Sequence, residues 1–142
     1  MKISKAKLSD AEQIAHVELN SGYHKNKKFD ALSMIKHFFS QKNASIFITK
    51  EKNKIIGYIT LRKHKNLGEI DFLAVIKKHQ GKGVGQKLFR YVLDKASKLR
   101  IKKLLLEVRK DNNKAISIYE KHGFKKIETK KKKSITKIIM QK

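Results

Sequence analysis

Cysteine, proline and tryptophan are all absent from this chain of 142 residues and 16.5 kDa. Without cysteine the protein has no disulfide bond, no thiolate metal site and no cysteine-linked acyl-enzyme. Long apolar runs are missing as well, because none approaches the roughly 20 residues of a membrane-spanning helix. The N-terminal residues MKISKAKLSD contain no signal-peptide core. We therefore expect a cytoplasmic protein that has no membrane partner.

Acidic residues are scarce. The chain has 12 Asp and Glu against 36 Lys and Arg, which gives a formal net charge of +24. A charge of this size favours an anionic partner such as RNA or the ribosome. The competing interpretation is compositional, because 32 of the basic residues are lysine, and abundant Lys, Ile and Asn are typical of a genome rich in A and T. The sequence leaves both interpretations open.

The length and the 39% apolar content indicate one globular domain, residues 1–142, rather than a disordered polycation. Apolar periodicity predicts a mixed α/β order of elements. The predicted helices cover residues 9–20, 31–39, 83–99 and 112–122, and the predicted strands cover residues 2–7, 45–49, 55–61, 68–75, 103–108, 124–129 and 134–140. The strands at 68–75 and 103–108 flank one helix, so we expect them to be parallel.

A glycine-rich loop follows the strand at 68–75. It reads Gln80-Gly81-Lys82-Gly83-Val84-Gly85, and four lysines lie in or near it, Lys77, Lys78, Lys82 and Lys87. A helix N-terminus with free N–H groups binds phosphate, so the loop is a candidate phosphate site. The alternative is that the glycines serve only a tight turn from strand to helix. Neither the Walker pattern GxxxxGK[ST] nor the dinucleotide pattern GxGxxG is present.

Two segments resemble the GNAT superfamily of N-acetyltransferases. Leu73-Ala74-Val75 followed by the loop is similar to its acetyl-CoA-binding motif, Q/R-x-x-G-x-G/A after a strand. Leu106-Glu107-Val108-Arg109 with Asn112, Ala115, Tyr119 and Gly123-Phe124 resembles its C-terminal half. The resemblance implies a single GNAT-like domain with a mixed, mostly antiparallel sheet of six or seven strands, a central parallel βαβ unit and about four helices.

The same resemblance implies acetyl-CoA as cosubstrate and no metal. Pantetheine and the thioester carbonyl would contact the backbone of Leu73, Ala74 and Val75. The pyrophosphate would contact the loop and the start of its helix, at Gln80, Gly81, Lys82, Gly83, Val84, Gly85 and Gln86. Asn112 would add a further contact. The six histidines have no spacing typical of a metal site.

Acyl transfer to an alkylamine needs a base, because an amine with a pKa near 10.4 is mostly protonated at neutral pH. Glu107 interrupts an apolar strand and by resemblance matches the base of the ribosomal-protein N-terminal acetyltransferases. Glu69 matches the base of the histone-acetyltransferase branch. Asp71 shares the face of Glu69 and matches an acid of sugar-phosphate acetyltransferases. We rank them in that order; the alternative for each is an exposed residue or an ion pair with a lysine.

Tyr119 is the candidate general acid for the thiolate that leaves. Asn112, Ala115 and Tyr119 lie on one stripe of the last predicted helix. A tyrosine on such a stripe is most often a core residue, but the motif around it favours the catalytic role. A backbone amide near Val75 would hold the oxyanion. These roles imply direct transfer in a ternary complex.

The acceptor is less well defined. Residues 20–30 would form one wall of its site, with Tyr23 and Phe29 as possible contacts. The last hairpin departs from the N-terminal acetyltransferase branch, because only residues 130–134 separate its strands and none is aromatic. The net charge favours an acidic or phosphorylated acceptor, or one held on a nucleic-acid scaffold. We therefore expect a protein or peptide amine; the alternatives are a small-molecule amine, of the amino-sugar phosphate or amino-acid type, and a non-catalytic basic binding module.

Overall fold

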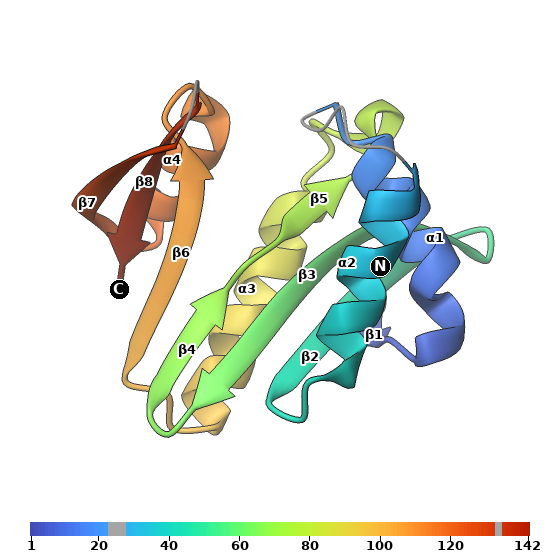
Figure 1. Cartoon of the computed structure of the whole chain (residues 1–142), viewed down its shortest axis with the longest axis horizontal. Coiled ribbons are helices and arrows are strands. Elements are labelled where there is room, and N and C mark those ends of the chain that lie inside the picture. Colours follow the sequence, from blue (N-terminus) through green and yellow to red (C-terminus); the bar gives the residue numbers. More distant parts are fainter. Residues whose placement is uncertain (23–27, 133–134) are drawn as a thin grey trace.

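The computed structural model describes residues 1–22, 28–132 and 135–142, and within them eight strands form one sheet (Figure 1). The strand order is β1-β2-β3-β4-β6-β8-β7, and β5 pairs with β3. The strands are β1 (Ile3–Lys5), β2 (Ala44–Glu51), β3 (Lys54–His64), β4 (Leu67–Ile70), β5 (Leu73–Val75), β6 (Lys103–Arg109), β7 (Lys125–Lys132) and β8 (Ile135–Gln141). The helices are α1 (Ala11–Leu19), α2 (Lys28–Ser40), α3 (Val84–Lys98) and α4 (Asn113–Lys121), with short 3-10 helices η1 (Leu8–Asp10) and η2 (Lys77–His79).

The predicted mixed sheet with one parallel pair is confirmed. β4 and β6 are parallel and α3 connects them, whereas the other pairings are antiparallel. Helices cover both faces of the sheet. Figure 1 shows α1 and α2 on one side of β2 and β3 and α3 on the other. No helix in the described ranges is both long and apolar enough to cross a lipid bilayer.

Two apolar clusters, one on each face, hold the helices to the sheet. On β2, Phe47 belongs to the cluster under α3, whereas Ile46 and Ile48 belong to the cluster under α1 and α2. Strand alternation produces this division, because successive side chains point to opposite faces. β3 is buried from Ile55 to Leu61 and contributes to both clusters.

A buried polar pair lies inside the α1–α2 cluster. The Tyr58 hydroxyl on β3 donates a hydrogen bond to Glu18 Oε1 on α1, and both residues are almost fully buried. Burial raises the pKa of the Tyr58 phenol well above its usual range, and the Glu18 carboxylate raises it further. Tyr58 is therefore protonated at neutral pH and holds α1 against the central strand.

Three local predictions were wrong. The strand predicted over residues 68–75 is two strands, β4 and β5, with different partners. The helix predicted from residue 9 starts instead as the 3-10 helix η1, whose Asp10 carboxylate accepts from Lys7 N (2.9 Å), and α1 begins at Ala11. Lys130–Lys132 were predicted to form the last turn but belong to β7, so the connection to β8 is shorter than expected. Tyr23, a predicted acceptor contact, lies outside the described residues, as does the side chain of Phe29.

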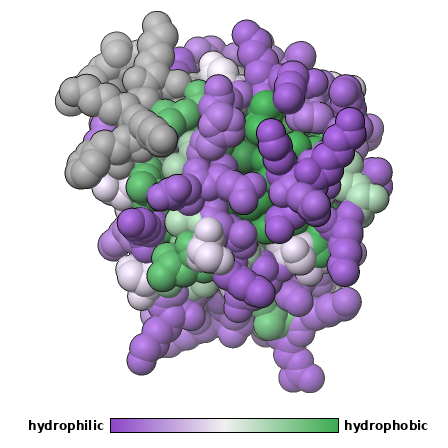
Figure 2. Space-filling view, turned by 90° about the vertical axis from the view of Figure 1, so that its right-hand side faces the viewer, coloured by the Kyte–Doolittle hydropathy of each residue, from purple (hydrophilic) through white to green (hydrophobic). Residues whose placement is uncertain are grey.

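Exposed lysines occur far from the last hairpin as well as on it, for example Lys52 and Lys54 at the β2–β3 turn and Lys125 and Lys126 on β7. The side of the molecule at the right of Figure 1, which includes α1 and the β2–β3 turn, is dominated by hydrophilic side chains with small apolar areas between them (Figure 2). The positive charge is therefore not confined to the C-terminal hairpin, where the sequence has its longest lysine run.

Candidate active site

The edges of β5 and β6 that face each other have no strand partner among the described residues. The ladder between β4 and β6 ends at Ile70 and Leu106, and β5 pairs only with β3. Beyond Leu106, β6 continues through Glu107 to Arg109 with β8 as its one partner. Figure 1 shows β5 and β6 diverging from that point. Backbone groups on both strands are therefore free to bind a ligand.

At the open edge of β5, only every second residue directs its backbone N–H and C=O groups away from β3. The backbone of Phe72 and Ile76 hydrogen bonds to β3, at 3.0 and 2.9 Å. Bonding alternates along an antiparallel pair, so Leu73 and Val75 direct their N–H and C=O groups away from β3. The Val75 carbonyl accepts from Gln80 Nε2 (2.8 Å). The N–H groups of Leu73 and Val75 remain for a ligand, where the sequence predicted the pantetheine and oxyanion contacts.

Thr60 on β3 causes the break between β4 and β5. Its buried Oγ1 accepts hydrogen bonds from the N–H groups of Asp71 (3.2 Å) and Phe72 (3.0 Å). These two amides therefore bond to a side chain, and the chain shifts its register between Ile70 and Leu73 without leaving a buried donor unpaired. The pairing with β3 shifts by one residue at this break, and β5 diverges from β6.

The loop before α3 has the backbone of an anion site. Gly81 and Gly83 adopt positive φ angles of 79° and 83°, which side chains rarely tolerate. An added Cβ at either glycine would meet no atom within 4 Å, so space is left above the loop. Gly83 precedes the first turn of α3, which has no side-chain cap and no acidic residue. Its first N–H groups therefore point outward with the positive end of the helix dipole.

Gln80 connects this loop to two other segments. Its Nε2 donates to Val75 O (2.8 Å) and to Ser21 O (2.7 Å), beyond the end of α1. Both amide protons are therefore used inside the protein, and the predicted coenzyme contact at Gln80 depends on its Oε1 and its backbone. Lys77 and Lys82 lie close to the glycines in sequence and supply positive charge.

Glu69 and Asp71, two of the three predicted bases, share one cation. Arg62 on β3 makes two hydrogen bonds to Asp71, from Nε to Oδ2 (2.6 Å) and from a terminal nitrogen to Oδ1 (2.9 Å). The same terminal nitrogen contacts Glu69 Oε2 at 2.7 Å. The hydrogen bond to Asp71 raises the pKa of Arg62, so the guanidinium keeps its charge. Both carboxylates are consequently paired with a permanent cation.

Glu107 lies apart from this network. It is on β6 beyond the end of the parallel ladder, and its one ion pair among the described residues is with Lys130 Nζ at 3.4 Å. Both side chains are about half exposed, at 44% and 56%, so the pair is weak. Leu106 and Val108 belong to the cluster under α3, so alternation places Glu107 on the opposite face of the sheet.

Tyr119 lies on the α3 side of the sheet. Its buried ring packs against Phe89 of α3 and Phe124, with centroids 5.0 and 6.2 Å apart. Asn112 caps α4, and its Oδ1 accepts from Ala115 N (3.3 Å). The open edges of β5 and β6 thus lie between Glu107 on one face and the helix that carries Tyr119 on the other.

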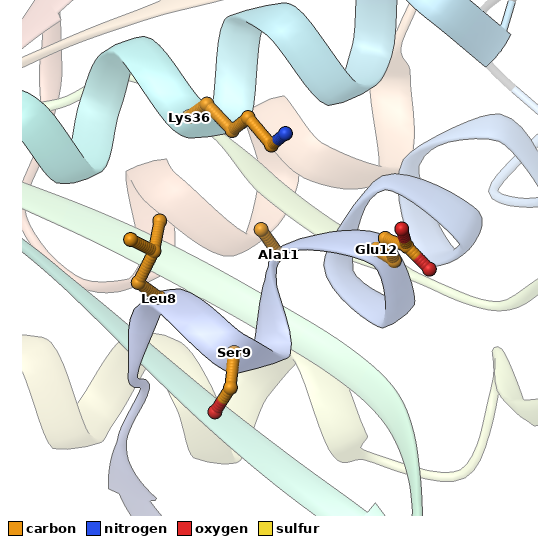
Figure 3. A pocket seen from close by; sticks show the side chains of 5 residues that line it. All are labelled: Leu8, Ser9, Ala11, Glu12 and Lys36. Atoms are coloured by element: carbon orange, nitrogen blue, oxygen red, sulfur yellow. The ribbon is translucent and has the colours of Figure 1, made fainter.

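A separate pocket is formed by η1, α1 and α2, and it is lined by Leu8, Ser9, Ala11, Glu12 and Lys36 (Figure 3). None of these residues belongs to the predicted motifs. Figure 3 shows the Ser9 side chain directed away from Lys36 and Glu12, so the pocket has no nucleophile next to a base. In the described parts of the chain, no three His, Asp or Glu side chains are grouped as metal ligands would be.

Comparison with known proteins identifies the family. The profile described as the acetyltransferase (GNAT) family matches residues 10–124, most of the chain. The chain belongs to the GNAT acetyltransferase family. This finding confirms the resemblance of the two motifs, and it makes the protein an acyltransferase.

Two curated relatives are N-acetyltransferases by name. N-alpha-acetyltransferase 30 of Schizosaccharomyces pombe is 27% identical over 122 residues, which cover 82% of this chain and 77% of the relative. N-acetyltransferase 9-like protein of Caenorhabditis briggsae is 28% identical over 87 residues, which cover 60% of this chain and 40% of the relative. Much of this GNAT domain is thus shared with the first of them.

Solved structures confirm the GNAT fold over nearly the whole chain. The ribosomal-protein-S18-alanine N-acetyltransferase of Escherichia coli aligns with a TM-score of 0.86 at 22% identity, over 99% of this chain and 91% of that one. The PaiA N-acetyltransferase of Thermoplasma acidophilum, in complex with coenzyme A, aligns with a TM-score of 0.79 at 23% identity, over 99% and 97%. The open edge of β5 and the glycine loop fit coenzyme A, since one offers N–H groups and the other an anion site.

Sequence reasoning missed Thr60 and Arg62. Arg62 could have been suspected, because it is one of only four arginines in a lysine-rich chain and arginine binds carboxylates in a bidentate manner. Thr60 gave no signal, since threonine is an ordinary residue of a buried strand.

Thr60→Val tests whether the break in the sheet prepares the coenzyme site. Valine has a similar shape but cannot accept from the amides of Asp71 and Phe72, so we expect a loss of about 1–3 kcal/mol in stability and roughly tenfold weaker acetyl-CoA binding. Denaturant unfolding and calorimetric titration measure the two effects. Thr49→Val is the matched control, because buried Thr49 donates to Lys2 O (3.0 Å) at the other side of the sheet. Equal losses of coenzyme affinity in both variants would contradict the assignment.

Proposed function

We propose that the protein transfers the acetyl group of acetyl-CoA to a protein or peptide amine by direct attack in a ternary complex. The observation that carries the proposal is the pair of unpaired strand edges, β5 and β6, between Glu107 on one face and Tyr119 on the other. A coenzyme held at these edges, with its pyrophosphate at the amides of Gly81 to Gln86, would meet an acceptor approaching from the Glu107 side. The names of the relatives support a protein or peptide acceptor.

Glu107 is the better base of the two glutamates. Glu69 is 2.7 Å from the charged Arg62, which also binds Asp71, and a carboxylate paired with a guanidinium is a weaker proton acceptor. Among the described residues the one ion pair of Glu107 is with Lys130, at 3.4 Å. Because Glu107 is partly exposed and close to the open edge, it takes the proton of the acceptor ammonium, directly or through a water molecule.

Two protein side chains carry the proton transfers that accompany the bond changes of the reaction. The acceptor nitrogen forms a C–N bond to the acetyl carbon, and the C–S bond breaks. Glu107 takes one proton from the acceptor ammonium and releases it to water, and then takes the second proton that the nitrogen loses as the C–N bond forms. The Tyr119 hydroxyl gives a proton to the sulfur and regains one from water. The free N–H of Val75 stabilises the negative oxygen between these events.

Initial-rate kinetics test this order of events. With acetyl-CoA and a peptide varied together, we expect intersecting double-reciprocal lines, because both substrates are bound before transfer. Parallel lines would show an acetylated enzyme and would overturn direct transfer. If no amine or peptide is acetylated at all, a non-catalytic binding module becomes the better assignment.

Glu107→Gln separates the two candidate bases. We expect it to lower kcat about 100-fold, in the range of general-base contributions, with the acetyl-CoA affinity kept. Glu69→Gln is the matched control, and its kcat should fall less than about threefold, because the base contribution belongs to Glu107. The reverse order of losses would move the base to Glu69.

Tyr119→Phe tests the general acid. The ring and its packing on Phe89 and Phe124 are retained, so we expect the melting temperature to stay within a few degrees and kcat to fall about 100-fold. Tyr91→Phe is the control, since Tyr91 packs on Phe47 in the same apolar cluster, away from the open edge. An unchanged kcat would remove Tyr119 from the mechanism.

A further inference from the structure

Three basic side chains form a row across β6, β8 and β7, next to Glu107. Arg109 is opposite Lys137, and Lys137 is opposite Lys130. Glu107 is two residues from Arg109 on the same strand, so alternation places Glu107 and this cationic row on one face. The contact between Lys130 and Glu107 agrees with that placement. In Figure 1 this part of the sheet lies beside α1 and α2, not beneath them.

Like charges directly opposite one another in a sheet are destabilising. Two members of the row have an anionic neighbour: Arg109 pairs with exposed Asp111 (2.9 Å) and Lys130 with Glu107 (3.4 Å). Lys137, in the middle, is half-buried and has no ion pair with any described residue. The row therefore concentrates positive charge whose central member is not neutralised inside the protein.

We propose that the cationic row binds an acidic side chain of the acceptor peptide, one or two residues after its N-terminal amine. This inference rests on the proposed function. A strand rises about 3.3 Å per residue, so Glu107 and the row are roughly 7 Å apart along β6. An extended peptide covers that distance in two residues. Its ammonium would lie at Glu107 and its carboxylate at Lys137, which gives charge complementarity at both ends.

The same row also limits which acceptors bind. A lysine or arginine at the second or third position of the peptide would meet Arg109, Lys130 and Lys137, and like charges brought together in this way oppose binding. Substrate choice would thus be set by the residues that follow the acetylated one. The acceptor class is a peptide or protein N-terminus with Asp or Glu at position 2 or 3.

A set of matched peptides tests the proposal. The peptides differ only at position 2 or 3, which holds Asp, Asn or Lys, and the kcat and KM of each are measured with saturating acetyl-CoA. We expect a KM about tenfold lower for Asp than for Asn, and higher still for Lys. Lys137→Gln should remove most of the difference between Asp and Asn, Lys137→Arg should keep it, and Lys137→Glu should reverse the order of Asp and Lys.

Lys131→Gln is the control variant. Lys131 is exposed on the same strand as Lys130, and its cross-strand partner is Thr136, so it points to the other face of the sheet. The Lys131→Gln variant should show the same KM differences among the three peptides as the unmodified protein. Fluorescence anisotropy of labelled peptides, with desulfo-coenzyme A bound, gives the same comparison without turnover.

Several results would overturn the inference and leave the proposed function intact. One is acetylation of all three peptides with equal KM, or a preference that Lys137→Gln does not change. Another is that Lys137→Gln weakens acetyl-CoA binding and not peptide binding, which would make the row a coenzyme phosphate site. A third is that Lys137→Gln loses salt-dependent binding to single-stranded RNA while its KM for each peptide is unchanged, which would make the row an RNA contact. Absence of acetylation of every peptide overturns both proposals.

Discussion

The hydrogen bonds from two consecutive backbone amides to Thr60 set the point at which β5 leaves the β4–β6 ladder. The candidate coenzyme site depends on that break. In a β-strand with a neighbour on each side, the N–H and C=O groups are hydrogen bonded to those neighbours and are not available to a ligand. Because Oγ1 of Thr60 accepts from the N–H groups of Asp71 and Phe72, the chain leaves the β4–β6 ladder there without losing buried hydrogen bonds. β5 then continues beside β3 alone. Among the described residues, the N–H groups at its other edge and those of β6 beyond Leu106 that point away from β8 have no strand partner, and they lie at the same candidate site as the N-terminus of α3.

The acids of this chain are few, and the site holds several of them in different environments. Arg62 neutralises Glu69 and Asp71 through three short hydrogen bonds. Glu107, on the neighbouring strand, has only a longer contact to an exposed lysine. Residues of one chemical type, all on the same face, are thereby divided between two that Arg62 pairs and one that it does not, and the proposed base is the latter. The cause is one guanidinium that reaches two carboxylates and does not reach the third.

Much of the fold was predictable because it follows from periodicity and from end signals. The apolar stripe of α3 and the glycine at its start, Gly83, predict that helix, and Asn112 and Gly123 delimit α4. The break at Asp71 was not predictable, since Ile70 to Leu73 reads as continuous strand and the acceptor for its amides lies on another strand. The Glu18–Tyr58 pair was equally hidden, because 40 residues separate its members. The motifs indicated the candidate site, whereas the tertiary contacts decide which carboxylates are paired with Arg62.

The net charge of +24 now has more than one physical consequence. Lysines near the glycine loop attract the phosphates of a coenzyme, which is a polyanion. Arg109, Lys137 and Lys130 repel a cationic acceptor and attract an acidic one. Both attractions act over a distance of about one Debye length, 8–10 Å, at physiological salt, so they assist encounter more than they fix the bound geometry. This field disfavours the ammonium of the acceptor too, and in the proposed complex Glu107 would compensate for that locally. A strongly basic surface is therefore compatible with amine acetylation when a carboxylate lies at the reacting end and the cations lie where the rest of the peptide passes.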